Sequence, residues 1–298
     1  MDSLILSPHS AEAQEMLRNI ELIYTDLDGT MLAPGGRLFV NHDGQPSNQL
    51  GEALSKLKAA GVEVVLVTGR TRSSLAEMIR LMDLSGFMGE IGTVSQRGLG
   101  YTGKHKFHTG EMPYDPNCNK TPYQIIDESG IVDKLIAAFP GFLEYSPSAF
   151  REVSHLLRGR VNLEEAQAIL DKGKLPLVIT DNGRINSLPG PCSLAIDKDV
   201  HIYHIMPKGC SKAVAVRADI LDRGIDKSKT LAIGDALTDV QMGLETRAFV
   251  TVQNGLKSAA VVNEISKNNR PVIATVKPTI DGWCECAQAI LEAKGLSS

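Results

Sequence analysis

The sequence predicts an α/β fold in which a mostly parallel sheet, covered by helices on both faces, is interrupted by a separate α+β insertion. Apolar strands and amphipathic helices alternate at the two ends of the 298-residue chain, and this alternation stops only in the middle. The length supports two domains, since a domain typically takes about 150 residues. Acidic and polar residues directly follow several predicted strands, at the edge of an open α/β sheet where ligands bind.

The N-terminal part of the chain predicts the first elements of the large sheet. Residues 2–19 are expected to form a short accessory helix, and residues 20–25 an apolar strand. Leucines at helical spacing make 47–60 an amphipathic helix. Residues 62–67 are almost entirely apolar, as in a strand with both faces covered, and 73–82 follow as a helix.

The alternation returns near the C-terminus. The expected elements are helix 211–221, strand 231–233, helix 238–245, strand 249–252, helix 257–267, strand 271–276 and helix 283–294. Strands and helices at this spacing favour parallel pairing, with the helices on both faces of the sheet.

The middle of the chain has a different pattern. It predicts a proline-rich loop at 111–125, helices at 130–139 and 162–172, and a strand at 175–180. Asp181-Asn182-Gly183 is expected to form a turn, and a second short strand to begin at Arg184.

This change of pattern sets the expected domain organisation. We assign residues 111–198 to an inserted α+β cap domain. Residues 1–110 and 199–298 then form one core domain, built from two parts of the chain that lie far apart in sequence.

Composition excludes several classes of protein. Hydrophobic residues make up 43% and charged residues 22%, which is ordinary globular usage and not that of a disordered or fibrous chain. A net charge of −4 and a pI near 6.0 give no general attraction to nucleic acid or to an anionic membrane. No apolar run approaches the ~20 residues that cross a bilayer, and the first residues lack a basic signal region. With five scattered cysteines and no disulfide framework, we expect a cytoplasmic protein without nucleic-acid or membrane partners.

The most specific motif is YTDLDGT at residues 24–30, where the first core strand ends. Asp26 and Asp28 are two positions apart and can bring two carboxylates toward one point as the chain curls away from the sheet. Gly29 permits the tight turn this requires. A turn that merely caps the strand is the alternative, and it would be preferred for an isolated pair of aspartates.

Two other positions carry groups suited to a phosphate. Thr68 and Gly69 follow the strand at 62–67, where a hydroxyl, free amides and a helix N-terminus converge, although a plain helix cap explains them equally well. Lys212 opens the helix at 211–221, where its charge opposes the helix dipole, so a compensating anion is expected. Lys208 is the competing lysine and is better explained as a solvated loop charge.

A second pair of acids, Asp235 and Asp239, follows the strand at 231–233. Together with Asp26 and Asp28 they place four carboxylates at one sheet edge, where they repel one another unless a cation neutralises them. Carboxylate oxygens beside a phosphate favour Mg²⁺, and no His or Cys cluster in the sequence competes for a transition metal.

These four stretches, in this order, resemble the haloacid dehalogenase superfamily of phosphatases. The D-x-D-G-T sequence is the most specific of the family's motifs. The long segment between Thr68 and Lys212 is similar to the type IIB subgroup, which carries a large α/β cap there and includes Cof-like, sucrose-phosphate and mannosyl-3-phosphoglycerate phosphatases. The resemblance covers residues 20–296 and implies a Rossmann-like core.

The resemblance also implies roles for these residues. Asp26 would be the nucleophile that forms an aspartyl-phosphate, and Asp28 the group that protonates the leaving oxygen and then activates water. Thr68, Gly69 and Lys212 would hold the phosphoryl oxygens. Mg²⁺ would be bound by Asp26, Asp235 and the main-chain carbonyl of Asp28, while Asp239 would bind the metal or orient Lys212.

The sequence departs from that pattern in three places. Thr238 stands where many relatives have Asn, the segment 31–48 is longer than in typical Cof-like chains, and the N-terminal extension is extra. Asn254 matches a family asparagine near the site, and a simple turn is the alternative.

The cap offers candidates for contact with the far end of a substrate. A sugar or glyceryl acid phosphate would suit Arg158, Arg160, Asn182 and Arg184, because guanidinium groups favour bidentate contacts with carboxylates and phosphates. The alternative is that these charges form a solvated face.

We therefore expect a Mg²⁺-dependent phosphomonoester hydrolase that acts on a small phosphorylated metabolite. A phosphotransferase or mutase of the same fold, a non-catalytic binding protein and a dehalogenase are the alternatives. The sequence does not identify the substrate or the oligomeric state.

Overall fold

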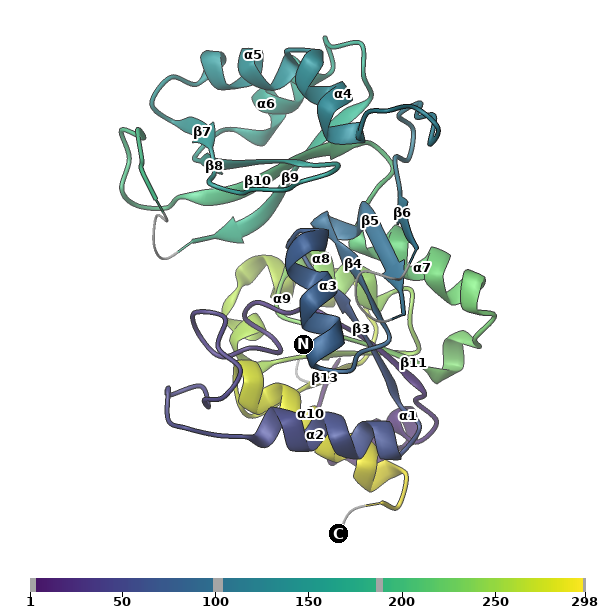
Figure 1. Ribbon diagram of the computed structural model, residues 1–298. Helices are drawn as coiled ribbons and strands as arrows, with labels where there is room; N and C mark the ends of the chain where they lie inside the picture. The colour runs from purple at the N-terminus through teal and green to yellow at the C-terminus, as the bar shows by residue number, and fades with distance from the viewer. Residues whose placement is uncertain (1–3, 99–103, 186–189, 297–298) are drawn as a thin grey trace.

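The computed structural model describes residues 4–98, 104–185 and 190–296. Two sheets organise these residues (Figure 1). The large sheet has nine strands in the order β1-β13-β12-β11-β2-β3-β4-β5-β6, and the pairings from β1 through β4 are parallel. Its strands are β1 (Ile5–Leu6), β2 (Leu22–Thr25), β3 (Glu63–Val67), β4 (Gly86–Gly89), β5 (Val94–Arg97), β6 (His105–Phe107), β11 (Thr230–Gly234), β12 (Ala248–Thr251) and β13 (Val272–Ala274). The expected α/β fold with a parallel core sheet is confirmed.

Helices cover both faces of this sheet, as expected when parallel strands are joined by helical crossovers. On one face, α1, α2, α3 and α10 pack around Trp283, Leu50 and Ile79. On the other, α7, α8 and α9 pack around Val216, Val240 and Ile265. The bounds are α1 (Ala11–Leu17), α2 (Gln49–Ala59), α3 (Arg72–Leu81), α7 (Lys212–Arg223), α8 (Leu237–Gly243), α9 (Ala259–Asn268) and α10 (Thr279–Ala293), with short 3₁₀ turns η2 (Glu90–Gly92), η4 (Lys227–Lys229) and η5 (Gln253–Lys257).

The second sheet is smaller and antiparallel, in the order β7-β8-β10-β9. Figure 1 shows it beyond one end of the core, with α4, α5 and α6 on its far side. Its elements are β7 (Leu143–Tyr145), β8 (His155–Gly159), β9 (Leu177–Arg184), β10 (His201–Pro207), α4 (Pro122–Glu128), α5 (Ile131–Ala138) and α6 (Leu163–Leu170). These elements share a core of their own around Leu135, Leu157 and Ile205. We call this unit the cap.

Three details of the expected fold are wrong. Residues 2–19 are not one helix, because Ile5–Leu6 pairs with β13 as an edge strand and α1 begins only after Ser10, whose side chain caps it. Asp181-Asn182-Gly183 is not a turn, because β9 continues through it. The expected boundary at 198/199 is also misplaced, since β10 pairs with β8 and β9 in the cap sheet and not with the core.

The course of β10 has a consequence for the site. The strand ends at Pro207, and α7 begins at Lys212 after a turn of four residues. Ser211 caps this helix by accepting a hydrogen bond from the Val214 amide. Lys212 therefore follows directly after the last strand of the cap in the chain.

Candidate active site

Three neighbouring strands bring the motif residues together at one edge of the core sheet. β2 lies between β11 and β3, and Thr25 is in register with Ile233 on one side and with Leu66 on the other. The amide of Asp26 still donates to the carbonyl of Ile233, at 2.9 Å. Asp26 and Asp235 therefore leave adjacent strands at the same edge, and Thr68 leaves the third.

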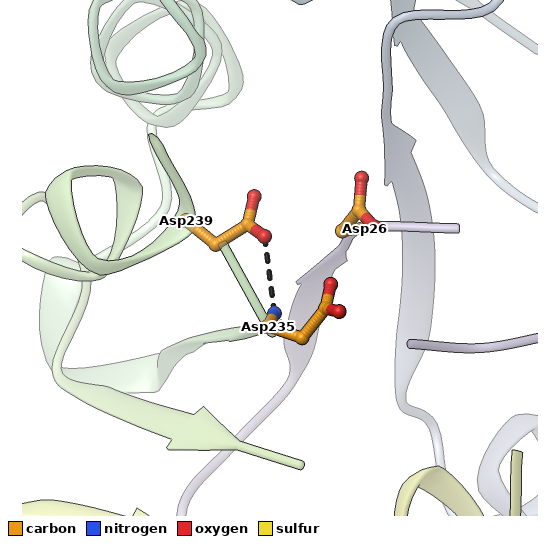
Figure 2. Close-up of side chains that lie close together, drawn as sticks. All are labelled: Asp26, Asp235 and Asp239. Carbon is orange, nitrogen blue, oxygen red and sulfur yellow. Dashed lines mark hydrogen bonds between the residues drawn. The ribbon is translucent and has the colours of Figure 1, made fainter. Parts of the chain in front are cut away.

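The acidic residues form a compact cluster (Figure 2). The carboxylates of Asp26, Asp235 and Asp239 offer oxygens that all lie within 4.8 Å of one another. The ammonium of Lys212 lies 2.6 Å from Oδ1 of Asp26 and 2.8 Å from Oδ1 of Asp239. Lys212 is only 2% exposed, so these two aspartates are its counter-ions within a buried site. The compensating anion expected at this helix start is present.

Burial and mutual repulsion shift the protonation of the cluster. Burial, with Asp239 and Asp235 nearby, raises the pKa of Asp26 to about 8 even though Lys212 lowers it. Burial and Asp239 likewise raise the pKa of Asp235 to about 6. Burial alone would lower the pKa of Lys212, but Asp239 and Asp26 more than offset it and raise that pKa. The lysine thus stays charged, and its one positive charge leaves the three carboxylates undercompensated.

Asp239 accepts three hydrogen bonds within the protein. Its Oδ1 accepts from Lys212, and its Oδ2 accepts from the amides of Asp235 and Ala236 at the start of α8. Of the two roles that the family resemblance implied, this geometry favours orienting Lys212 over binding a metal.

Asp235 is held by neutral donors on both oxygens. Oδ1 accepts from the hydroxyl of Thr30 at 3.0 Å, and Oδ2 accepts from the side-chain amide nitrogen of Asn254 at 2.8 Å. Asn254 also donates to the carbonyl of Gly29. We expected Asn254 among the substrate contacts, but its side chain is occupied in fixing the turn after β2 and the carboxylate of Asp235.

Gly29 is required where it stands. Its φ is +86°, in the region that favours glycine, and a Cβ at this position would lie 2.6 Å from Oδ2 of Asp235. The Gly of the D-x-D-G-T motif therefore allows both the turn and the close approach of the carboxylate.

Asp28 has a partner that the sequence did not reveal. Arg70 grips its carboxylate bidentately, with Nε at 2.8 Å from Oδ2 and a terminal nitrogen at 2.6 Å from Oδ1. The pair is partly exposed. The hydrogen bond to Asp28 raises the pKa of Arg70 despite its partial burial. The only sequence signal was the position of Arg70 directly after Thr68-Gly69.

The cap contacts the Thr68–Gly69 motif. Arg151, in the cap segment before β8, donates to the carbonyl of Gly69 at 3.0 Å. A Cβ on Gly69 would lie 3.1 Å from the side-chain nitrogen of Asn182 and 3.2 Å from Nε2 of His204. Of the cap residues expected at the substrate, Asn182 is thus brought to the site.

The other three cap candidates lie differently. Arg158 is wrong as a substrate contact, because it is 1% exposed, pairs with Glu144 at 2.6 Å and donates to the carbonyl of Pro191. Arg158 forms an ion pair with Glu144 inside the cap, and the sequence alone does not distinguish such an arginine from one on the surface. Arg160 and Arg184 are exposed, and their contact with substrate stays a prediction.

The donor set fits a hard divalent cation. The cluster consists of carboxylates alone, which suits Mg²⁺ and not a soft metal. Three ionised carboxylates against one ammonium would leave two negative charges, and a divalent ion would neutralise them. Among the described residues no donor contacts Oδ2 of Asp26 and each oxygen of Asp235 accepts one hydrogen bond, whereas Oδ2 of Asp239 accepts two.

Comparison with known proteins identifies the family. The model of the haloacid dehalogenase-like hydrolases matches residues 23–94 and 182–273, more than half of the chain. The chain therefore belongs to this family of hydrolases, as the motifs predicted. The matched segments contain Asp26, Thr68, Lys212 and Asp235.

Individual relatives are distant. A phosphoglycolate phosphatase of Methanoculleus marisnigri is 23% identical over 79% of this chain and 85% of its own length. A chloroplastic endoribonuclease of Arabidopsis thaliana is 24% identical over 83% of this chain, which spans only 44% of that protein.

Solved structures share the fold over both the core and the cap. A haloacid dehalogenase superfamily phosphatase of Bacteroides thetaiotaomicron aligns with a TM-score of 0.60 at 16% identity, covering 98% of both chains. The sucrose-phosphatase of Synechocystis aligns with a TM-score of 0.58 at 15% identity, covering 93% of this chain and 97% of its own. Within the described ranges, no helix combines the length and apolar character needed to cross a bilayer.

Proposed function

We propose that the protein is a Mg²⁺-dependent phosphomonoester hydrolase that acts through an aspartyl-phosphate on Asp26. The observation that carries the proposal is the buried bridge of Lys212 between Asp26 and Asp239, next to Asp235 and the Thr68–Gly69 turn. Such an arrangement suits phosphoryl transfer, in which positioning and neutralisation of charge provide most of the catalysis.

Asp26 would attack phosphorus through the oxygen that Lys212 does not hold. Oδ1 accepts from Lys212, so Oδ2 is the available nucleophile. As the new O–P bond forms, the bond from phosphorus to the ester oxygen breaks, and that oxygen leaves with a proton from Asp28. Water then attacks phosphorus and gives a proton to Asp28, the bond between phosphorus and Oδ2 of Asp26 breaks, and inorganic phosphate leaves with Asp26 restored as a carboxylate.

The proton transfers require Asp28 to part from Arg70. Both oxygens of Asp28 accept from this guanidinium, so at least one must be released before the carboxyl carries a proton. Mg²⁺ held by Asp26 and Asp235 would offset the repulsion between the carboxylate and the anionic phosphate. Thr68, Gly69 and Lys212 would hold the phosphoryl oxygens.

We further propose that the substrate is a small metabolite such as a sugar phosphate or a phosphorylated carboxylic acid. Two observations support this class. The phosphatases similar to this chain include one named for phosphoglycolate and one for sucrose phosphate. The cap also lies directly over Gly69, which restricts the volume available to a leaving group.

The proposal is tested by replacing Asp26 with Asn. We expect turnover of p-nitrophenyl phosphate to fall by about 10⁴-fold or more, because the nucleophile is lost, with circular dichroism unchanged. The exposed Asp43→Asn is the matched control and should keep wild-type activity. Normal turnover by Asp26→Asn would exclude the assigned nucleophile.

The same assay separates the alternatives. A phosphotransferase would pass the phosphoryl group to an added alcohol in preference to water, which product analysis detects. A dehalogenase would release halide from a haloacid and keep its activity in EDTA, whereas we expect EDTA to abolish phosphatase turnover and Mg²⁺ to restore it. A binding protein would release neither product.

A further inference from the structure

Two cap side chains meet over Gly69, and the phosphoryl chemistry proposed above uses neither of them. His204 lies in β10 and Asn182 in β9, so both come from the cap sheet. Their nitrogens lie 3.2 and 3.1 Å from the point that a Cβ on Gly69 would occupy. Because Gly69 belongs to the motif expected to hold the phosphoryl group, these nitrogens face the space beside it.

The protonation state of His204 follows from its partners. Nδ1 lies 3.1 Å from Oγ of Ser154 and 3.3 Å from a terminal nitrogen of Arg151, which also donates to the carbonyl of Gly69 and to Ser154 Oγ, so these contacts fit either ring tautomer. Burial, followed by Arg151 and Lys212, holds the pKa of His204 well below its usual value. The ring is therefore neutral, and Nε2 is the ring nitrogen that faces Gly69.

Nε2 of His204 is open to a ligand. His204 is 1% exposed, and among the described residues no hydrogen bond to Nε2 is found, yet Nε2 is not one of the unpartnered side-chain atoms that are shut off from solvent. A ligand that enters beside Gly69 can therefore use its hydrogen-bonding capacity.

The ring is also fixed in place. Ser154 lies 3.1 Å from Nδ1, and its hydroxyl and amide both contact the fully buried carboxylate of Glu90. The Glu90–Ser154–Arg151 network thus sets the orientation of the imidazole before any ligand binds.

A β-bulge directs Asn182 to the same place. Arg184 pairs with His201 and Asp181 with Tyr203, so two residues of β9 oppose the single Ile202 of β10. Gly183 takes a φ of +97°, which accommodates the extra residue. Bulges of this kind redirect side chains beside active sites, and here the carboxamide lies over Gly69.

We propose that His204 and Asn182 form a subsite that hydrogen-bonds an oxygen of the leaving group, a hydroxyl or a carboxylate, within a few bonds of the ester oxygen. This inference rests on the proposed phosphatase activity. The short reach follows from the position of both nitrogens directly over Gly69. A purely structural role, in which the two side chains only pack the cap against the core, makes a different prediction.

Three two-carbon phosphate esters separate the two roles. Ethyl phosphate has no second oxygen, 2-hydroxyethyl phosphate adds a hydroxyl, and 2-phosphoglycolate adds a carboxylate. We expect the wild-type enzyme to favour at least one oxygen-bearing ester over ethyl phosphate in kcat/KM, by about tenfold or more. The ester with the larger preference tells which oxygen the subsite takes.

Variants of the two side chains should remove that preference. His204→Leu should bring the ratio of kcat/KM between the preferred ester and ethyl phosphate down by about tenfold, since it lacks the ring nitrogen. His204→Gln should retain most of the ratio, because its side-chain amide can place a polar atom near the position of Nε2. Asn182→Ala, which breaks no part of the Glu90 network, should lower the ratio severalfold, and it tests the subsite even if His204→Leu folds poorly.

The matched control is His201→Leu. His201 lies on the same strand, is paired with Asp181 and contacts no motif residue, so the ratio should be unchanged. The subsite is refuted if the wild-type enzyme shows no preference among the three esters, or if His204→Leu and Asn182→Ala lower kcat/KM equally for all of them. Absence of turnover for every phosphomonoester would instead refute the proposed function itself.

Discussion

Single residues at strand ends were the most predictable feature of the site. Asp26 and Asp235 converge because a parallel sheet sets its carboxyl ends side by side, and this follows from the order of strands alone. Lys212 joins them from the start of α7. The partners of these residues were less predictable. Arg70 reaches Asp28 from the next strand, and His204 reaches Gly69 from the cap, so both depend on distances that only the folded chain defines.

The sequence-based prediction for Arg158 fails for a physical reason. Arg158 was predicted to bind substrate because of its guanidinium group, but in the structure Glu144 neutralises that group inside the cap. A buried ion pair between residues fourteen positions apart leaves no periodic signal in the sequence. Asn254 was predicted near the site and lies there, and its role in holding Asp235 emerges from its contacts.

The acid cluster predicts a characteristic dependence of stability on pH. In the metal-free fold the pKa values of Asp26 and Asp235 are raised to about 8 and about 6, from an ordinary value of 3.8. Between the unfolded pKa of 3.8 and the raised folded values, the folded chain binds more protons than the unfolded chain. The contribution of these two groups to the free energy of unfolding is therefore complete below about pH 4 and falls as the pH rises toward 8. We expect the difference in urea midpoint between the wild-type protein and Asp26→Asn, both measured in EDTA, to decrease as the pH is raised from 5 to 8.

Mg²⁺ provides the control for this measurement. A cation at the cluster would favour the ionised carboxylates, so saturating Mg²⁺ should flatten the fall and stabilise the protein most at pH 8. A difference between wild type and Asp26→Asn that stays constant from pH 5 to pH 8 in EDTA would contradict the raised pKa values.

At the scale of elements, turn chemistry was the weak point of the sequence interpretation. Asp181-Asn182-Gly183 has the composition of a hairpin turn, and Gly183 does adopt a positive φ. The strand continues because β10 pairs with it on both sides of the irregularity. The same Asp-Asn-Gly sequence thus forms a β-bulge and not a hairpin turn. Which of the two forms depends on the partner strand β10, which follows much later in the chain.

The turn after β2 gives a prediction at this scale. Gly29→Ala combines an unfavourable φ with a Cβ 2.6 Å from Oδ2 of Asp235. Gly61→Ala is the matched control, since Gly61 has a similar φ of +72° with open space around it. Both substitutions should cost about 1–2 kcal/mol in unfolding free energy. Only Gly29→Ala should also lower kcat/KM, by about 100-fold, and raise the Mg²⁺ concentration for half-maximal activity. Equal activity of the two variants would show that Asp235 does not depend on this contact.

For the whole molecule, the sequence predicted two units, and the structure adds how they join. Arg72 of the core grips Glu152 of the cap bidentately, at 2.6 and 2.9 Å. Glu90 of the core accepts from the amides of Glu152, Val153 and Ser154, in a backbone conformation with a φ of +49° that is uncommon for glutamate. We propose that the division into core and cap falls at these contacts, with β10 in the cap.

Breaking this joint should loosen the cap without unfolding either unit, because each has its own apolar core. Glu90→Gln is nearly isosteric, but its amide nitrogen would face backbone N–H donors that now meet carboxylate oxygens. We expect the amides of Val153 and Ser154 to exchange with deuterium at least tenfold faster, with KM raised severalfold because Arg151 and His204 lose their support.

Glu128→Gln is the control for this variant, since Glu128 is exposed on the cap and, among the residues described, forms its ion pair with Lys120. It should change neither exchange nor KM, because an exposed ion pair contributes about 0–1 kcal/mol. If Glu90→Gln leaves the exchange of the 152–154 amides at the wild-type rate, Glu90 does not hold the cap. The closure of the cap over Gly69 would then depend on Arg72 and Arg151 alone.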